Sequence, residues 1–113
     1  MREKLLLGAL LPALALVALA GLPATAEGLK VISDKTATGF KFPESVAYDA
    51  AAGVLYVSEF GSALKPTEKD GQGRISKVAL DGKVLEERFL PPAGQTLDKP
   101  KGIWVAGNRL WVT

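Results

Sequence analysis

The chain has 113 residues, a formal net charge of +2, and neither Cys nor His. Without His, a Ser-His-Asp or Cys-His mechanism is excluded within these residues, and the usual transition-metal ligand is missing. Without Cys there are no disulfides, so core packing must hold the fold together. The metal chemistry that remains uses oxygen ligands, which favours calcium or magnesium over zinc.

The first 26 residues have the pattern of a secretory signal peptide. Arg2 and Lys4 precede a run rich in Leu and Ala over residues 5–20, and Ala24-Thr25-Ala26 forms a small-x-small cleavage site. The alternative is a membrane anchor, which would need about 20 consecutive apolar residues. The pattern therefore predicts an exported protein, periplasmic or secreted, with no membrane segment after cleavage.

Cleavage of 26 of the 113 residues would leave 87. The loss of Arg2, Glu3 and Lys4 would lower the net charge from +2 to +1. A net charge of +1 does not indicate a basic surface that would attract nucleic acid or an anionic membrane. No nucleic-acid partner is predicted.

After a lead-in segment at 27–41, the sequence predicts two strands joined by a turn. Residues 45–49 alternate, with Val46 and Tyr48 on one face and Ala47 on the other. A turn follows at 51–53. The continuously apolar residues 54–57 are typical of a strand that is covered on both faces.

Two more strands are predicted at 74–80 and 84–90, after a long loop at 61–73. The Asp81-Gly82 pair between them predicts a type I′ hairpin turn, because both residues tolerate a positive φ. The charged residues 86–88 suit an exposed sheet edge, where charge deters pairing with another chain. Four strands joined in this way form an antiparallel meander, and no helical period appears after residue 26.

The strand pattern then starts again. Pro43 and Pro100 lie 57 residues apart, and the strand at 54–57 resembles Leu110 to Thr113. One four-stranded sheet per repeat of roughly 40–50 residues is the signature of a β-propeller blade, and the long loop accounts for the excess length. A β-sandwich is the alternative, but it need not repeat the same strand pair. The predicted domains are a first blade at 42–97 and the start of a second at 98–113.

A propeller needs at least four blades to close its ring. One blade and two further strands cannot close it, so we expect an N-terminal fragment of a larger protein. From the repeat length, six blades would take roughly 300 residues plus the signal peptide. By itself the fragment is expected to be marginally stable, because single repeats cannot bury their apolar faces.

Three segments carry a resemblance to a known family: PESVAYD at 43–49, GVLYVSEFG at 53–61 and GRISKVALDGKV at 73–84. In this order the segments resemble the blades of six-bladed propellers of the NHL-repeat and gluconolactonase superfamily. The gluconolactonase group includes senescence marker protein and luciferin-regenerating enzyme. The resemblance covers residues 42–113. It implies an all-β propeller fold, whereas blade consensus alone serves many activities.

In its lactonase branch, the resemblance implies a divalent metal, calcium in the first place, on the propeller axis. Glu44 is the position that matches the ligand at the entry to the first blade, and later blades would supply the other ligands. The implied activity is hydrolysis of sugar lactones or related esters, with the fragment itself inactive. The alternative is a non-enzymatic NHL-type propeller that binds a ligand or a protein partner in the cell envelope.

Several residues also have plain structural interpretations. Glu44 could be a solvated carboxylate at a strand entry, or hydrogen-bonded to a neighbouring blade, and Lys101 occupies the equivalent place in the second blade. Glu59 is expected to be structural. Trp104 and Trp111 could stack on sugars, but alternate strand positions favour core packing. The loop at 61–73 reads as solvated, although long loops of repeat proteins often border binding sites.

Overall fold

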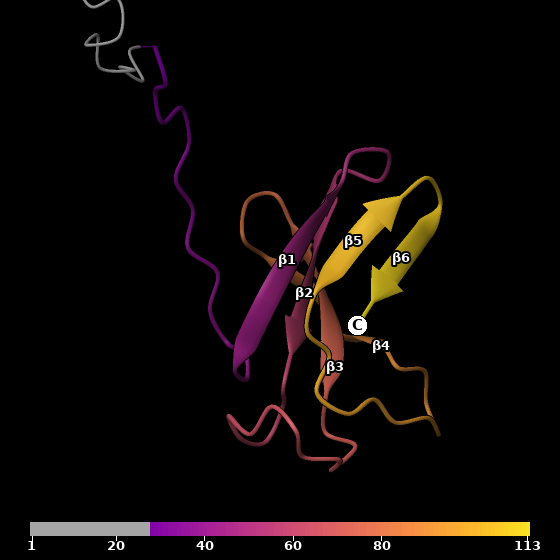
Figure 1. Ribbon diagram of the computed structural model, residues 1–113. Helices are drawn as coiled ribbons and strands as arrows, with labels where there is room; N and C mark the ends of the chain where they lie inside the picture. Colours follow the sequence, from indigo (N-terminus) through magenta and orange to yellow (C-terminus); the bar gives the residue numbers. More distant parts are fainter. Residues whose placement is uncertain (1–27) are drawn as a thin grey trace, which may run out of the picture. The chain divides into compact units, whose positions relative to one another are not determined.

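Four strands follow one another along the chain, and each pairs antiparallel with the next (Figure 1). The computed structural model describes residues 28–113, in which no helix occurs. The sheet has the order β1-β2-β3-β4. Its strands are β1 (Pro43–Asp49), β2 (Val54–Glu59), β3 (Arg74–Ala79) and β4 (Val84–Leu90). The predicted antiparallel meander is confirmed, with strand ends that shift by one or two residues.

A separate two-stranded sheet follows, made of β5 (Ile103–Ala106) and β6 (Arg109–Val112). The two strands pair directly across a two-residue turn, in which Gly107 has a φ of 59°. A positive φ at the first turn position is what a type II′ turn requires, and glycine adopts it without strain. The described residues thus form an all-β fold with one four-stranded and one two-stranded sheet.

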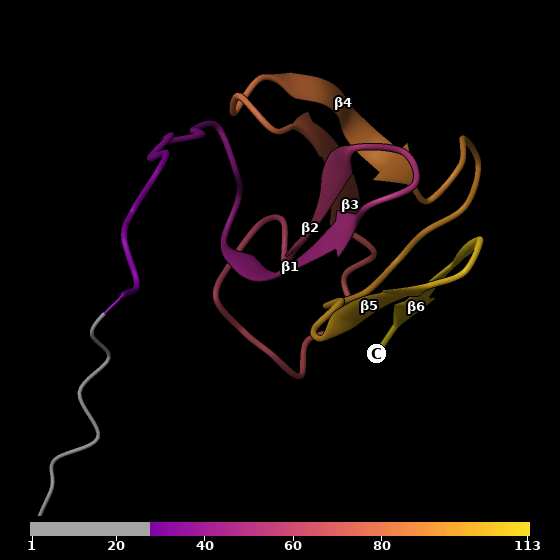
Figure 2. The ribbon, with the colours of Figure 1, turned by 90° about the horizontal axis from the view of Figure 1, so that it is seen from above.

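The core lies between the two sheets. β5 packs against β1 and, less extensively, against β2, and Figure 2 shows the β5–β6 hairpin beside the larger sheet. The first sheet contributes Ala47, Val54, Tyr56 and Ile75 to this core, and the second contributes Ile103. Alternation along each strand explains which residues are in the core, because every second residue points to the same face of the sheet. The core therefore lies where β5 packs against β1 and β2.

Two sequence predictions are wrong in detail. The Asp81-Gly82 turn is not type I′, because that type needs a positive φ at both central residues, and Gly82 has one whereas Asp81 does not. Instead, Ala79 and Lys83 enclose a three-residue loop with glycine in its last position. Trp104 and Trp111 were expected in the core, but they pair with each other on the outer face of the hairpin, 70% and 56% exposed.

The opposite face of the larger sheet is partly covered by the segment that leads into β1. The Lys41 amide donates to the Glu59 carboxylate, and the Thr36 carbonyl lies next to Gly82 in the β3–β4 loop. Val46 and Tyr48 remain exposed on that face, as their alternation with buried Ala47 predicts. Residues 33–113 form one compact unit.

The predicted signal peptide at 1–26 lies outside the described residues, which begin at Gly28. From that residue onward, no helix is long and apolar enough to cross a membrane. Within residues 28–32, Leu29, Val31 and Ile32 are strongly exposed and belong to no strand.

Candidate functional site

Glu44, the predicted metal ligand, is the extra residue of a β-bulge. Pro43 pairs with Glu59 and Ser45 pairs with Ser58, so Glu44 has no opposite residue on β2. Bulges turn a side chain out of the regular alternation and are frequent next to functional sites. The Glu44 side chain is exposed and borders a shallow depression with Val46 and Val57. It is therefore accessible to a ligand at the start of β1.

No group of three or more acidic side chains that could hold a metal occurs within residues 28–113. Glu44 can supply carboxylate oxygens, which suit calcium. Among the described residues, however, Glu44 belongs to no cluster of three such side chains.

Glu59 lies at the same end of the sheet, but it is fully buried. Its Oε2 accepts hydrogen bonds from the Lys41 amide at 2.5 Å and from Arg74 Nη2 at 2.9 Å. Its Oε1 accepts a short hydrogen bond from the Ser76 hydroxyl. A buried carboxylate needs such partners, because its desolvation is otherwise very costly. The expectation that Glu59 has a structural role agrees with these contacts.

Arg74 is also buried, and the three nitrogens of its guanidinium group differ in their contacts. Its Nη2 contacts Glu59, and its Nη1 lies 3.6 Å from the exposed Glu87 carboxylate. Its Nε has no hydrogen-bond partner among the described residues, although the atom is buried. The Arg74–Glu59 pair locks β3 to β2 at the point where the long loop leaves the sheet.

The loop at 61–73 is held by a second ion pair. Lys99 Nζ, on a side chain that is only 1% exposed, donates to Asp70 Oδ2 at 2.6 Å and to the Phe60 carbonyl at 3.0 Å. The Lys99 ammonium, with help from the Ser62 hydroxyl and the Gln72 amide, holds the pKa of Asp70 well below its usual range. The loop is thus fixed by specific polar contacts.

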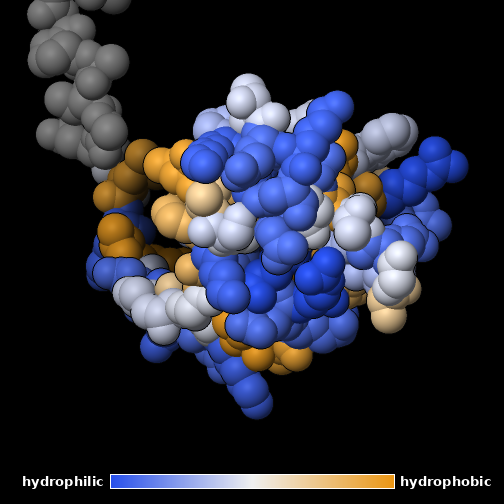
Figure 3. Space-filling model, turned by 90° about the horizontal axis from the view of Figure 1, so that it is seen from below, coloured by the Kyte–Doolittle hydropathy of each residue, from blue (hydrophilic) through white to orange (hydrophobic). Residues whose placement is uncertain are grey.

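Sequence reasoning missed Lys99, because a lysine between Asp98 and Pro100 looks like an ordinary exposed cation. Asp98 itself accepts a hydrogen bond from the Gly71 amide at 2.9 Å. Lys101, which occupies the place equivalent to Glu44 in the second strand pair, donates to the Pro66 carbonyl at 2.9 Å. These contacts tie the approach to β5 to the long loop. Seen from below, this end of the molecule is mostly hydrophilic (Figure 3).

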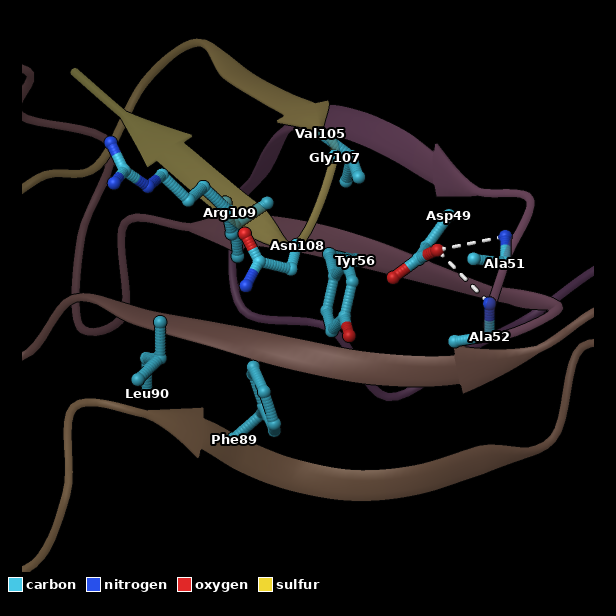
Figure 4. Close-up of a pocket in the computed structure, with 11 residues that line it drawn as sticks. Asp49, Ala51, Ala52, Tyr56, Phe89, Leu90, Val105, Gly107, Asn108 and Arg109 are labelled. Atoms are coloured by element: carbon cyan, nitrogen blue, oxygen red, sulfur yellow. Dashed lines mark hydrogen bonds between the residues drawn. The ribbon is translucent and has the colours of Figure 1, made fainter.

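At the other end of the sheets, a cavity of about 650 Å³ opens between β4 and the β5–β6 hairpin (Figure 4). Its apolar wall includes Tyr56 and Phe89, whose ring centroids lie 5.0 Å apart, together with Leu90 and Leu110. The Asp49 carboxylate closes one side, where its Oδ1 accepts the amide hydrogens of Ala51 and Ala52. No local sequence pattern predicts this cavity, because its walls come from segments that are far apart along the chain.

The pKa of Tyr56 is raised, first by burial and then by the nearby carboxylates of Asp49 and Glu86. The tyrosine is therefore neutral at physiological pH. It contributes an aromatic wall and a hydroxyl, with no charge of its own.

Comparisons of this chain with protein-family models, with curated proteins and with solved structures found no match.

Proposed function

We propose that this chain is the first blade and the start of the second blade of an exported six-bladed propeller that acts on a small lactone or related ester. The observation that carries the proposal is the stacking of the two sheets. β5, the first strand of the second sheet, lies against β1, the first strand of the first sheet. Equivalent strands of neighbouring propeller blades meet in this way around a common axis.

The equivalence extends to single side chains. Tyr56 in β2 is buried under the second sheet, and Trp111 in β6 occupies the matching place in the repeat. Trp111 and its partner Trp104 remain exposed on the face where a third blade would pack. Large exposed aromatics of this kind mark a surface made for further packing. In the proposed propeller they are core residues of the next interface.

Within this proposal Glu44 is one ligand of a divalent cation, with calcium as the preferred ion. Its place on a bulge at the start of β1 leaves its carboxylate exposed at the end of the sheet. Such an ion, when bound, would polarise the carbonyl of a lactone. Glu44 would hold the ion from the first blade, and later blades would supply the remaining ligands.

A second candidate, a non-enzymatic NHL-type propeller in the cell envelope, is favoured by a different observation. Glu59, Asp70 and Asp98 all accept internal hydrogen bonds at the Glu44 end of the molecule. Their carboxylates serve the fold. In this candidate Glu44 contacts a ligand or a protein partner without a catalytic metal.

The test uses the intact protein expressed from its full reading frame, assayed for hydrolysis of sugar lactones with calcium and with a chelator. We expect calcium-dependent hydrolysis that Glu44→Gln reduces strongly and that the exposed control Glu87→Gln leaves unchanged. Hydrolysis that is unaffected by Glu44→Gln would remove Glu44 from the site. Ligand binding without hydrolysis under any metal condition would favour the second candidate.

A further inference from the structure

The bulge at Glu44 separates two registers of the β1–β2 ladder. On the C-terminal side of the bulge, Ser45 pairs with Ser58. Continued without a bulge, that register would place Glu44 directly opposite Glu59, and like charges in opposite positions destabilise a sheet. Instead, Pro43 stands opposite Glu59. The bulge therefore places a proline, rather than a second carboxylate, opposite the buried glutamate.

The segment before the bulge is held in the shifted register by three hydrogen bonds. The Lys41 amide donates to Glu59 Oε2 at 2.5 Å. The Phe60 amide donates to the Phe42 carbonyl at 3.0 Å, and the Gly61 amide donates to the Lys41 carbonyl at 3.1 Å. Among these contacts Phe42 has a φ of 55°, which bulky residues rarely adopt. Such a conformation persists only where the surroundings fix it, so the backbone on this side of the bulge is firmly held.

On the other side of the bulge, the backbone is held by the side chain of Ser58. Its Oγ accepts the Ser45 amide hydrogen at 3.0 Å. A hydroxyl has one hydrogen to donate, and the nearer acceptor is the Lys101 carbonyl, at 2.7 Å against 3.4 Å for the Ser45 carbonyl. Ser58 is completely buried. One buried hydroxyl thus links the residue after Glu44 to Lys101, at the equivalent place in the second strand pair.

We infer that Ser58 is a positioning residue for Glu44. Its hydroxyl fixes the first residue after the bulge, so the backbone of Glu44 is held between two anchored segments and keeps one conformation. Without that hydroxyl the backbone of Glu44 samples several conformations, because a bulged residue has no ladder partner of its own. That the Glu44 carboxylate receives a divalent cation rests on the proposed function, whereas the role of Ser58 rests on the geometry.

The test compares Ser58→Ala with Val78→Ala in the intact protein. Val78 is a buried apolar residue of β3, so its truncation lowers stability away from the bulge. The first measurement is ¹⁵N relaxation without metal. We expect Ser58→Ala to lower the amide order parameter of Glu44 from about 0.85, a rigid-backbone value, to below about 0.6. Val78→Ala should leave it unchanged, and so should Ser58→Thr, which keeps the hydroxyl.

The second measurement is a calorimetric titration of the same variants with calcium chloride. We expect Ser58→Ala to weaken calcium binding by about tenfold or more, the loss typical of removing a residue that orients a metal ligand. Val78→Ala and Ser58→Thr should bind calcium as the wild type does. A role of Ser58 in stability alone would affect Val78→Ala and Ser58→Ala alike.

An unchanged order parameter of Glu44 in Ser58→Ala would overturn the inference. Calcium binding as tight as that of the wild type, in a variant that has lost this order, would overturn it as well. If Ser58→Ala does not fold, hydrogen exchange in the wild type decides, because a Ser45 amide that exchanges as fast as an exposed one would exclude the bond to Ser58. Absence of calcium binding by the wild type would contradict the proposed function, and the relaxation measurement would still decide the role of Ser58.

Discussion

Arg74 and Glu59 stand opposite each other on β3 and β2, with Nη2 of the arginine 2.9 Å from Oε2 of the buried glutamate. The pair joins two strands just where the long loop at 61–73 leaves them and returns. Its members come from the sequence pattern SEFG and GRIS, 15 residues apart along the chain. The geometry assigns both charges to the fold.

Glu59→Gln is therefore expected to destabilise the protein strongly. Removing one partner of a buried pair leaves the other charge unpaired, which costs about 3–5 kcal/mol. The control Glu87→Gln affects an exposed carboxylate 3.6 Å from Arg74, and should change the free energy of unfolding by less than about 1 kcal/mol. Urea unfolding measures both. Equal effects of the two substitutions would contradict the central role of Glu59.

Gly73 and Gly53 make a matched pair for a second prediction. A Cβ at position 73 would lie 1.6 Å from the Asp98 carbonyl oxygen, whereas a Cβ at position 53 would meet nothing within 4 Å. Gly73→Ala should thus prevent the loop from docking. Gly53→Ala should cost only the strain of its positive φ, about 1–2 kcal/mol. Thermal melts of both variants compare the costs, and a smaller loss at position 73 would contradict the packing described for it.

Glu44→Gln should leave the fold intact. The side chain is exposed and its residue has no opposite partner on β2, so the change in the free energy of unfolding is expected to stay within about 0.5 kcal/mol. The measurement is a urea titration without calcium. A larger loss would mean that Glu44 supports the bulge, and any loss of activity in that variant would then have to be interpreted as damage to the fold.

Local pattern was sufficient to predict the strands. Alternation at 45–49 and the apolar run at 54–57 reflect the two faces of a sheet, and both strands formed there. The Asp81-Gly82 turn went wrong because the dipeptide permits a type I′ turn without requiring one. The contribution of Lys99 depends on Asp70, 29 residues earlier, and no local pattern records such a contact. The tryptophans were expected in the core because alternate strand positions favour packing, but a period of two does not tell which of the two faces is covered.

Asp70 should make stability depend on acidity. Its pKa is held below the usual range, chiefly by Lys99 and then by Ser62 and the Gln72 amide. The folded state therefore binds fewer protons than the unfolded state at acidic pH. The stability it contributes is present above the ordinary aspartate pKa of about 3.9 and is lost as the pH falls below it.

Asp70→Asn is expected to flatten the fall in unfolding free energy between about pH 4 and pH 2, a range set by the ordinary aspartate pKa. Lys99→Met should flatten it as well, because it removes the main cause of the shift. Urea titrations at a series of pH values provide the comparison. A Lys99→Met variant with the wild-type slope would show that the ammonium is not the cause.

At alkaline pH the corresponding group is Tyr56. Burial first, and then the carboxylates of Asp49 and Glu86, raise the pKa of its phenol above the usual value of 10.0. The unfolded state then loses its proton at lower pH than the folded state, so stability must fall as the pH rises above about 10. Tyr56→Phe keeps the aromatic ring that packs on Phe89 and removes the ionisation. In this variant the free energy of unfolding should decline less steeply with rising pH. Asp49→Asn, which can keep the turn hydrogen bonds, should give an intermediate slope. If Tyr56→Phe declines as steeply as the wild type, the wall of the cavity is more open to water than the structure indicates.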